Sequence, residues 1–265
     1  MTEFLKKIIE EKKREVEEKK KNLPFSKLFK KVKNIASSSL FSSAFGSHPG
    51  IIAEIKKASP SRGNLFRRRK IENLAKAYQE HGASAISVVT EEKYFLGSLN
   101  DLKKLKAFLT IPVLRKDFIL DEYQILESKL FGADAVLFIA GLFTAKKIKK
   151  LLQLAEELAM EALIEIHTRE ELFKVLEIEA KIIGINNRDL NTFQVDLNTS
   201  KELLPLIPNS KIKIVESGIK DKKDINYFKK LKVSGFLIGE AFITSPDPGA
   251  TLRLFTSYLK KNDKN

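Results

Sequence analysis

Residues 51–89, with the sequence IIAEIKKASPSRGNLFRRRKIENLAKAYQEHGASAISVV, decide the fold. The stretch begins with a short apolar, β-branched run, Ile51–Ile55, and passes through a polar loop into a helical pattern over Ile71–His81. A second apolar run, Ala85–Val89, follows. Two apolar strands joined by a helix predict a βαβ unit, in which both strands run parallel and are buried.

The same alternation continues to the end of the chain. Helical patterns separate most of the later strands, for example Glu122–Phe131, Ala145–Ala159 and Arg169–Leu176. Eight units in 265 residues favour a closed (β/α)8 TIM barrel, which takes roughly 250 residues, over an open doubly wound sheet. No Gly-x-Gly-x-x-Gly follows the first strand, which argues against a dinucleotide fold. The remaining predicted strands are Val113–Arg115, Ala135–Ile139, Glu161–Ile166, Ile182–Ile185, Lys211–Val215 and Gly235–Ile238.

Residues 1–47 predict a helical extension packed on the barrel, and residues 48–265 predict the barrel catalytic domain. A charged helix over residues 3–21 has only a thin apolar stripe, so we expect it to lie across a larger body. Pro24 interrupts this pattern. A short second helix and a Ser-rich connector ending at Ser47 follow.

Composition narrows the class of protein. A hydrophobic fraction of 43% and a charged fraction of 31% suit a globular domain with a large core. The absence of cysteine excludes disulfides, thiolate zinc sites and cysteine nucleophiles, and is compatible with a reducing cytoplasm. Neither a signal peptide nor an apolar stretch of about 20 residues is present, so we expect a cytoplasmic protein with no membrane partner.

The net charge of +14 points to anionic partners. Nucleic acid and small phosphorylated substrates are both candidates, and solvated lysine-rich helix faces explain much of the excess. The basic run Arg67-Arg68-Arg69-Lys70 has no interleaved aromatic residues and accompanies no nucleic-acid-binding motif. We therefore predict no nucleic-acid partner.

Charged residues at the strand ends predict the active site, because a TIM barrel carries its active site there. Glu54 and Lys56 are two residues apart and share one face of the first strand, whereas Ala53 and Ile55 share the other. If the charged face is the interior, an ion pair lies at the barrel mouth. Glu165 lies between apolar neighbours on the fifth strand and would be costly to bury unpaired.

Two lysines are candidate partners for Glu165. One is Lys56, and the other is Lys116 in the cluster Arg115-Lys116-Asp117 that ends the third strand. A solvated turn is the alternative interpretation of this cluster. The sequence does not decide between the lysines.

Gly218 and Gly239 follow the seventh and eighth strands. Glycines there let backbone N–H groups approach an anion, and this is the usual phosphate site of the fold. The three histidines, His48, His81 and His167, show no ligand spacing, so we predict no metal site. His81 looks like a helix C-terminal residue, and His167 is expected to begin a helix.

Together these segments resemble the indole-3-glycerol-phosphate synthase family over essentially the whole chain. The helix around Lys12-Lys13-Arg14-Glu15-Val16 is similar to the family's additional N-terminal helix. The matching motifs are Glu54-Ile55-Lys56-Lys57-Ala58-Ser59-Pro60-Ser61, Ser87-Val88-Val89-Thr90-Glu91, Tyr94-Phe95-Leu96-Gly97-Ser98, Arg115-Lys116-Asp117-Phe118, Leu163-Ile164-Glu165-Ile166, Gly184-Ile185-Asn186-Asn187-Arg188-Asp189-Leu190, Glu216-Ser217-Gly218-Ile219 and Leu237-Ile238-Gly239.

The resemblance implies ring closure, decarboxylation and dehydration of 1-(2-carboxyphenylamino)-1-deoxyribulose 5-phosphate to indole-3-glycerol phosphate in tryptophan biosynthesis. It implies no cofactor and no metal. Lys116 is expected to act as general acid and Glu165 as general base. Glu54 would orient the two lysines, and which lysine acts in which step stays open.

The resemblance also assigns binding residues. Asn186 would position Glu165 or the substrate, and Arg188 would hold the substrate carboxylate. The remaining substrate or phosphate contacts would come from Lys56, Ser59, Glu216, Ser217, Gly218 and Gly239. An apolar slot for the anthranilate ring would consist of Pro60, Phe95, Phe118 and Leu137. We expect a monomer or weak homo-oligomer.

The chain departs from the family pattern in two places. Phe66-Arg67-Arg68-Arg69-Lys70 replaces an acidic Asp-Phe-Asp-Pro stretch in a loop expected to cover the active site. Gly239-Glu240-Ala241 lacks a serine that many relatives have, so one phosphate contact would come from the backbone alone.

Three other functions are alternatives. Phosphoribosylanthranilate isomerase shares the fold but typically uses a cysteine base, which is missing here. A Schiff-base aldolase would use a desolvated Lys56 or Lys116 as nucleophile. Nucleic-acid binding would follow from the net charge.

Overall fold

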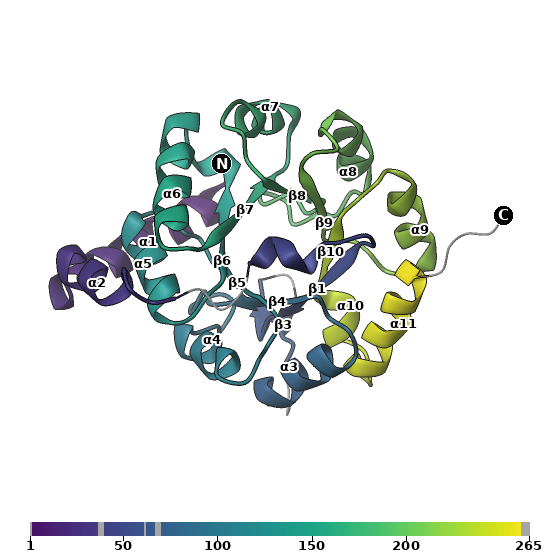
Figure 1. Ribbon diagram of the computed structural model, residues 1–265, viewed down its shortest axis with the longest axis horizontal. Helices are drawn as coiled ribbons and strands as arrows, with labels where there is room; N and C mark the ends of the chain where they lie inside the picture. The colour runs from purple at the N-terminus through teal and green to yellow at the C-terminus, as the bar shows by residue number, and fades with distance from the viewer. Residues whose placement is uncertain (1, 37–39, 61, 67–69, 261–265) are drawn as a thin grey trace.

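The computed structural model describes residues 2–36, 40–60, 62–66 and 70–260. Eight parallel strands close into a barrel in the order β1-β10-β9-β8-β7-β6-β5-β4, and helices surround it (Figure 1). Strand β1 closes the ring because it pairs with β10 on one side and with β4 on the other. The predicted (β/α)8 barrel is therefore confirmed.

All eight predicted strands are present, and no end differs from its predicted position by more than one residue. A short hairpin that the sequence did not predict, β2 and β3, follows the first strand. The barrel strands are β1 (Gly50–Ile55), β4 (Ala85–Val89), β5 (Val113–Lys116), β6 (Ala135–Ile139), β7 (Glu161–Ile166), β8 (Ile182–Asn186), β9 (Ile212–Glu216) and β10 (Gly235–Ile238), and the hairpin consists of β2 (Ala58–Ser59) and β3 (Gly63–Asn64).

Most of the helices between the strands begin with a side-chain cap. Thr168, for example, accepts a hydrogen bond from the N–H of Glu171, so α7 begins at Arg169, where the helical pattern of the sequence begins. The expectation that His167 begins this helix is wrong. His81 ends α3 as predicted, with Nδ1 2.7 Å from the oxygen of Ala77. The helices are α1 (Glu3–Asn22), α2 (Phe25–Val32), α3 (Ile71–Glu80), α4 (Leu99–Lys106), α5 (Glu122–Leu130), α6 (Ala145–Glu157), α7 (Arg169–Glu177), α8 (Asn198–Leu203), α9 (Lys222–Lys230), α10 (Glu240–Ile243) and α11 (Pro248–Lys260), with 3-10 turns η1 (Phe41–Ala44), η2 (Ala140–Leu142) and η3 (Leu204–Leu206).

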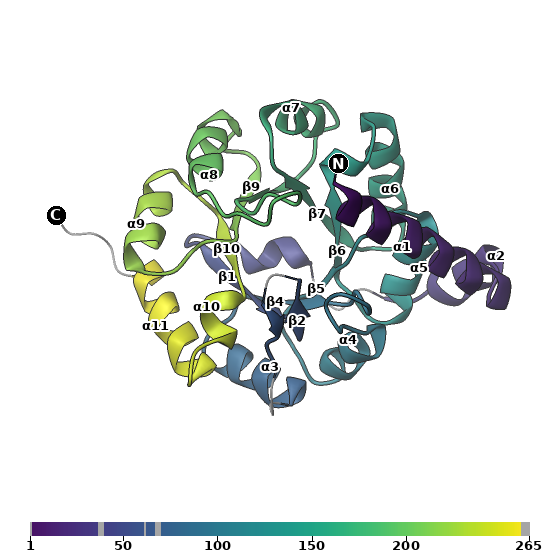
Figure 2. The same ribbon diagram turned by 180° about the vertical axis from the view of Figure 1, so that it is seen from behind.

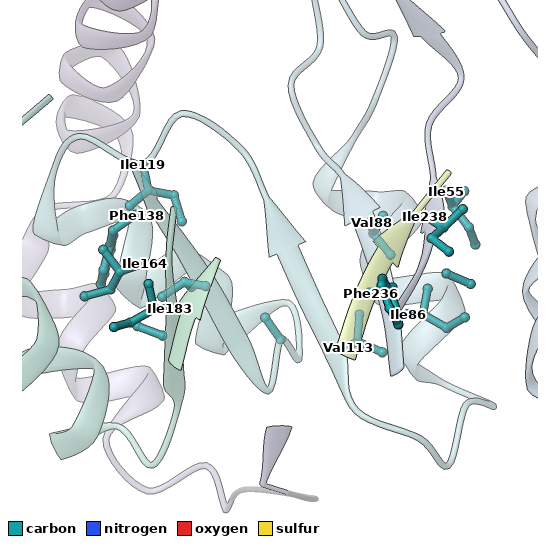
Figure 3. Close-up of a cluster of buried hydrophobic side chains, with 14 of the residues drawn as sticks. Ile55, Ile86, Val88, Val113, Ile119, Phe138, Ile164, Ile183, Phe236 and Ile238 are labelled. Carbon is teal, nitrogen blue, oxygen red and sulfur yellow. The ribbon is translucent and has the colours of Figure 1, made fainter. Parts of the chain in front are cut away.

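Alternation along the strands separates two apolar layers. Outward-facing residues such as Ile86, Phe138 and Ile164 pack beneath the surrounding helices, and Figure 3 shows them on the strands. Inward-facing residues such as Ile52 and Leu163 fill the barrel interior. Ala53 and Ile55 belong to the outer layer, which places Glu54 inside, as predicted.

The turn η1 closes the amino end of the barrel and lies across its opening in Figure 1. Phe41 is fully buried and packs with the interior residues Ile52 and Leu114. The N–H of Ser42 donates a 2.6 Å hydrogen bond to Glu161, the first residue of β7. Because the described residues of η1 fill the amino end, the cavity lies at the carboxyl ends of the strands.

Helix α1 lies on the other end of the molecule, on the side of β6 and α5 (Figure 2). The hydroxyl of Tyr123 donates to the carbonyl of Lys19 at 3.1 Å, and Lys20 pairs with Asp121 at 2.9 Å. The division of the chain into an extension over 1–47 and a barrel over 48–265 stays a prediction. Among the described residues, no helix is long and apolar enough to cross a membrane.

Candidate active site

A cavity of about 740 Å³ occupies the carboxyl end of the barrel. Its wall contains every residue that the sequence singled out for the site except Glu216, which is 1% exposed and lies beneath Lys116. The predicted residues on the wall are Glu54, Lys56, Ser59, Pro60, Phe95, Lys116, Phe118, Leu137, Glu165, Asn186, Arg188, Ser217, Gly218 and Gly239.

Lys116 occupies the centre of the charged part of this wall. Its Nζ lies 2.6 Å from Oε2 of Glu216 and 3.2 Å from Oε2 of Glu165. Lys116 and Glu216 end β5 and β9, Glu165 is the second-to-last residue of β7, and all three point inward by the alternation of their strands. Lys116 is therefore the partner of Glu165 that the sequence left undecided.

Lys56 pairs instead with Glu54, at 2.5 Å between Nζ and Oε1. Glu54 is 4% exposed and packs against Gly239, where a Cβ would lie only 2.6 Å from Oε1. Any side chain at position 239 would push the Glu54 carboxylate away. Close packing against Glu54 is therefore one reason for a glycine at position 239. The reason that we expected from the sequence is access of the backbone to an anion.

The charges of this cluster depend on one another. Burial alone would lower the pKa of Lys116, but Glu216, Glu165 and Glu54 outweigh it and raise the pKa well above its usual range. Burial raises the pKa of Glu216 to about 7, with Lys116 opposing the rise. For Glu165, burial is outweighed by Lys116 and His167, and its pKa is lowered. A protonated ammonium thus lies beside an ionised carboxylate.

Asn186 connects Glu165 to the rim of the cavity. Its side chain hydrogen-bonds Glu165, and its Oδ1 accepts a 3.0 Å hydrogen bond from the backbone N–H of Arg188. The Arg188 guanidinium lies 3.2 Å from Oε2 of Glu240, and Arg62 lies 2.5 Å from Oε1 of the same residue. Glu240 therefore bridges two arginines at the rim.

The loop after β9 begins with two consecutive residues in an uncommon backbone conformation. Ser217 and Gly218 both have left-handed backbone angles, with φ of 64° and 84°. A Cβ at Gly218 would also lie 2.6 Å from a side-chain carbon of Val195. Gly239 directly precedes α10. Phosphate binding at Ser217, Gly218 and Gly239 stays a prediction.

Apolar residues cover another part of the wall. The rings of Phe95 and Phe118 are tilted by 47°, with centroids 6.5 Å apart, and Pro60 and Leu137 line the same cavity. Helix α1 adds Phe4, Leu5 and Ile8, which sequence reasoning did not assign to the site although their spacing forms one helix face.

The side chains of Arg115 and Asp117, which flank Lys116 in the sequence, are buried in a separate network, although Asp117 is also among the residues that line the cavity. Arg115 is 1% exposed and its Nη2 lies 2.9 Å from Asp117, so the solvated-turn interpretation is wrong. Asp117 also accepts from Thr90 at 2.7 Å and lies 3.4 Å from Nζ of Lys12. The buried network fixes the strand end that carries Lys116.

His167 is a neighbour of the site that sequence reasoning did not include. Its Nε2 lies 3.4 Å from Oε1 of Glu165. His167 directly follows β7, two residues after Glu165, and this spacing was the available signal. The basic loop residues 67–69 and Ser61 lie outside the described residues. In the described part of the chain, no three His, Cys, Asp or Glu side chains are grouped to hold a metal ion.

An ammonium held between two buried carboxylates, in a cavity at the carboxyl end of a (β/α)8 barrel, defines an enzyme of acid–base chemistry. The family model described as "Indole-3-glycerol phosphate synthase" matches residues 5–255. The chain belongs to the indole-3-glycerol phosphate synthase family, whose members are carboxy-lyases of tryptophan biosynthesis.

Relatives with the same printed name support this assignment. A protein of Carboxydothermus hydrogenoformans is 43% identical over 260 residues, which are 95% of this chain and 98% of the relative. One of Desulforamulus reducens is 52% identical over 198 residues, 74% and 75% of the two chains. Among solved structures, 3-hexulose-6-phosphate synthase from Salmonella typhimurium has a TM-score of 0.64 at 13% identity, covering 79% of this chain and 98% of that one, which shows the fold alone.

Proposed function

We propose that this chain closes the indole ring: it converts 1-(2-carboxyphenylamino)-1-deoxyribulose 5-phosphate to indole-3-glycerol phosphate, carbon dioxide and water. The observation that carries the proposal is the Lys116 ammonium, held 3.2 Å from the Glu165 carboxylate on the cavity wall. This pair supplies one acid and one base within reach of the same substrate.

Lys116 is the proposed acid of ring closure. The aromatic carbon that bears the carboxylate attacks the sugar ketone, and negative charge develops on the ketone oxygen. An ammonium that stays protonated stabilises this charge and donates the proton. The raised pKa of Lys116 supports the role, because it keeps the proton on Nζ until the oxygen becomes basic.

Loss of carbon dioxide restores the aromatic ring, and dehydration follows. The hydroxyl leaves as water after taking a proton from a lysine, and Glu165 removes a proton from the adjacent carbon. The lowered pKa of Glu165 supports its role, since the carboxylate is ionised and free to accept. Glu54 orients Lys56, and Lys56 also contacts the substrate phosphate.

The remaining contacts follow the shape of the cavity. Arg188 holds the substrate carboxylate, and Ser59, Ser217, Gly218 and Gly239 bind the sugar and phosphate. Glu216, which we expected to bind substrate, lies beneath Lys116 and acts through that lysine instead. Pro60, Phe95, Phe118 and Leu137 enclose the anthranilate ring. The raised pKa of Lys116 disfavours this lysine as a Schiff-base nucleophile, because a nucleophilic amine must be unprotonated.

The first experiment follows the fluorescence of indole-3-glycerol phosphate on addition of the substrate, without added metal. We expect turnover by the wild type and losses of kcat of at least roughly 10²-fold in Lys116→Ala and Glu165→Ala. Lys103→Ala and Glu170→Ala, at exposed positions, are the matched controls. No turnover by folded wild-type protein would refute the function, and active Lys116 and Glu165 variants would refute the roles.

We also propose that the chain acts in the cytoplasm, as a monomer or weak homo-oligomer without a nucleic-acid partner. The absence of cysteine supports a reducing compartment. Sedimentation would measure the oligomeric state. Filter binding over a salt series would detect nucleic-acid binding, and tight binding at physiological salt would contradict the proposal.

A further inference from the structure

His167 lies directly behind the proposed base, on the side away from Lys116. Its Nε2 is 3.4 Å from Oε1 of Glu165, whereas Lys116 approaches the other oxygen, Oε2. The Nε2 atom is buried and has no hydrogen-bond partner among the described residues. The Nε2 atom is therefore close to the Glu165 carboxylate but forms no hydrogen bond with it.

The other side of the imidazole faces a second cavity. This outer cavity, of about 220 Å³, lies between the start of α7 and α8, and His167 is part of its wall. The His167 side chain is 15% exposed. His167 lines the outer cavity and not the main one, whereas Glu165 lines only the main one. Polar residues surround it, among them Thr168, Asp196, Asn198, Thr199 and Glu202.

Glu171 fixes the imidazole between the two cavities. Its Oε2 accepts a 2.7 Å hydrogen bond from the backbone N–H of His167 and lies 3.6 Å from Nδ1 of the ring. Its Oε1 packs against the backbone of Gly141, where a Cβ would lie only 2.5 Å away. The Glu171 carboxylate is thus itself held in place.

The proposed reaction leaves the enzyme one proton short in each turnover. The ketone oxygen takes one proton at ring closure, and the departing hydroxyl takes a second. Glu165 recovers only one, from carbon, because a carboxylate that leaves as carbon dioxide returns no proton. One proton must therefore enter from solvent in each turnover.

We propose that His167 is a proton-relay residue that returns one proton per turnover from the outer cavity to the Glu165–Lys116 pair. The inference rests on the proposed function. The imidazolium gives its Nε2 proton to the ionised Glu165 carboxylate, and the resulting carboxylic acid passes that proton to the neutral amine of Lys116, which restores the carboxylate and the ammonium. The neutral imidazole then takes up a proton from solvent through the outer cavity.

The surrounding charges suit this role. Carboxylates face the ring from four elements: Glu165 on β7, Glu171 on α7, Glu216 on β9 and Asp189 after β8. Burial lowers the pKa of His167, but Glu171, Glu165 and Glu216 outweigh it and raise the pKa above its ordinary value. The outer cavity adds Arg169, Asp196 and Glu202. The imidazolium thus persists to higher pH than usual, and relay should weaken as pH rises through the raised pKa.

The test compares steady-state kinetics of wild type, His167→Asn and His167→Gln with and without imidazole in the buffer. We expect both variants to lose about 10-fold in kcat with little change in KM, a smaller effect than loss of a group that touches substrate. Imidazole should restore kcat in the variants in a saturable manner and leave the wild type unchanged. His48→Asn, at an exposed connector position, is the matched control.

Three results would overturn the relay. These are an unchanged kcat in both variants, a reduced kcat that imidazole does not restore, or an equal loss in His48→Asn. Thermal unfolding of each variant identifies any that fails to fold, and the other variant then decides. Failure of the wild type to turn over would instead refute the proposed function.

Discussion

The ammonium of Lys116 lies 2.6 Å from Oε2 of Glu216, closer than to the proposed base. Glu216 is 1% exposed, and its Oε1 has no hydrogen-bond partner among the described residues. Lys116 thus compensates Glu216 on one oxygen only. The carboxyl group is held in a site that favours its neutral form, which links proton binding to stability and catalysis.

The first prediction concerns this carboxyl group and pH. Its pKa rises from 4.5 to about 7 on folding, so its contribution to stability is complete below pH 4.5 and is lost as pH increases through 7. Relative to Glu216→Gln, the wild type should lose up to about 3 kcal/mol of unfolding free energy over this window. Urea unfolding of both proteins between pH 4 and 8 measures the difference. A constant difference would show that Glu216 does not titrate there.

The second prediction concerns Gly184, whose missing side chain leaves room for Glu216. A Cβ at this position would collide with Oε1 of Glu216 and come within 3.1 Å of Leu163. Gly184→Ala should therefore displace the carboxylate from Lys116 and lower kcat by about 10²-fold. Gly46→Ala is the matched control, because a Cβ there would have nothing within 4 Å. Equal activity of the two variants would contradict the argument.

The strands could be predicted because their apolar runs are continuous and bounded by polar loops. The hairpin of β2 and β3 could not, since each of its strands has only two residues and neither shows a periodic pattern. Turn η1 could not be predicted either, for a related reason. Phe41 lies in a Ser-rich connector, and only the closed barrel supplies the apolar floor in which it is buried.

The sequence predicted that Glu54 faces the barrel interior, because its neighbours Ala53 and Ile55 face the helices. It did not predict which charged side chains pair inside the barrel. Alternation assigns a side chain to the interior, but the stagger of the barrel decides which inward residues meet. Lys56 and Lys116 therefore remained equal candidates for Glu165 until the closed barrel separated them. Burial of Arg115 and Asp117 likewise depends on Lys12 and Ser128, which are distant in the sequence.

The third prediction concerns Glu240, which bridges Arg62 and Arg188 at the rim. If Arg188 holds the substrate carboxylate as proposed, the Glu240 carboxylate competes with the substrate for that guanidinium group. Glu240→Gln should lower KM by about 2- to 5-fold, corresponding to about 1 kcal/mol or less for a half-exposed pair. Steady-state kinetics at low salt measure the effect, with the exposed Glu92→Gln as control. A higher KM would mean that Glu240 orients the arginines for substrate.

The last prediction concerns Lys12 of helix α1. Its side chain is 2% exposed, and its Nζ lies 3.4 Å from Oδ1 of Asp117 and 2.7 Å from Glu15. Burial would raise the pKa of Asp117, but Arg115 and Lys12 outweigh it and hold the pKa at about 2. Lys12→Met keeps the apolar stem and removes the charge, so it should cost about 3 kcal/mol of unfolding free energy at pH 7.

The acid limb of the stability curve separates this ion pair from simple packing. A lowered carboxyl pKa contributes stability above pH 3.8 that is lost as pH falls toward 2. In Lys12→Met the pKa of Asp117 should rise, so the deficit relative to wild type should shrink as the pH falls through this window. The exposed Lys13→Met is the matched control. A deficit that is the same at pH 2 and pH 7 would attribute the loss to packing of α1.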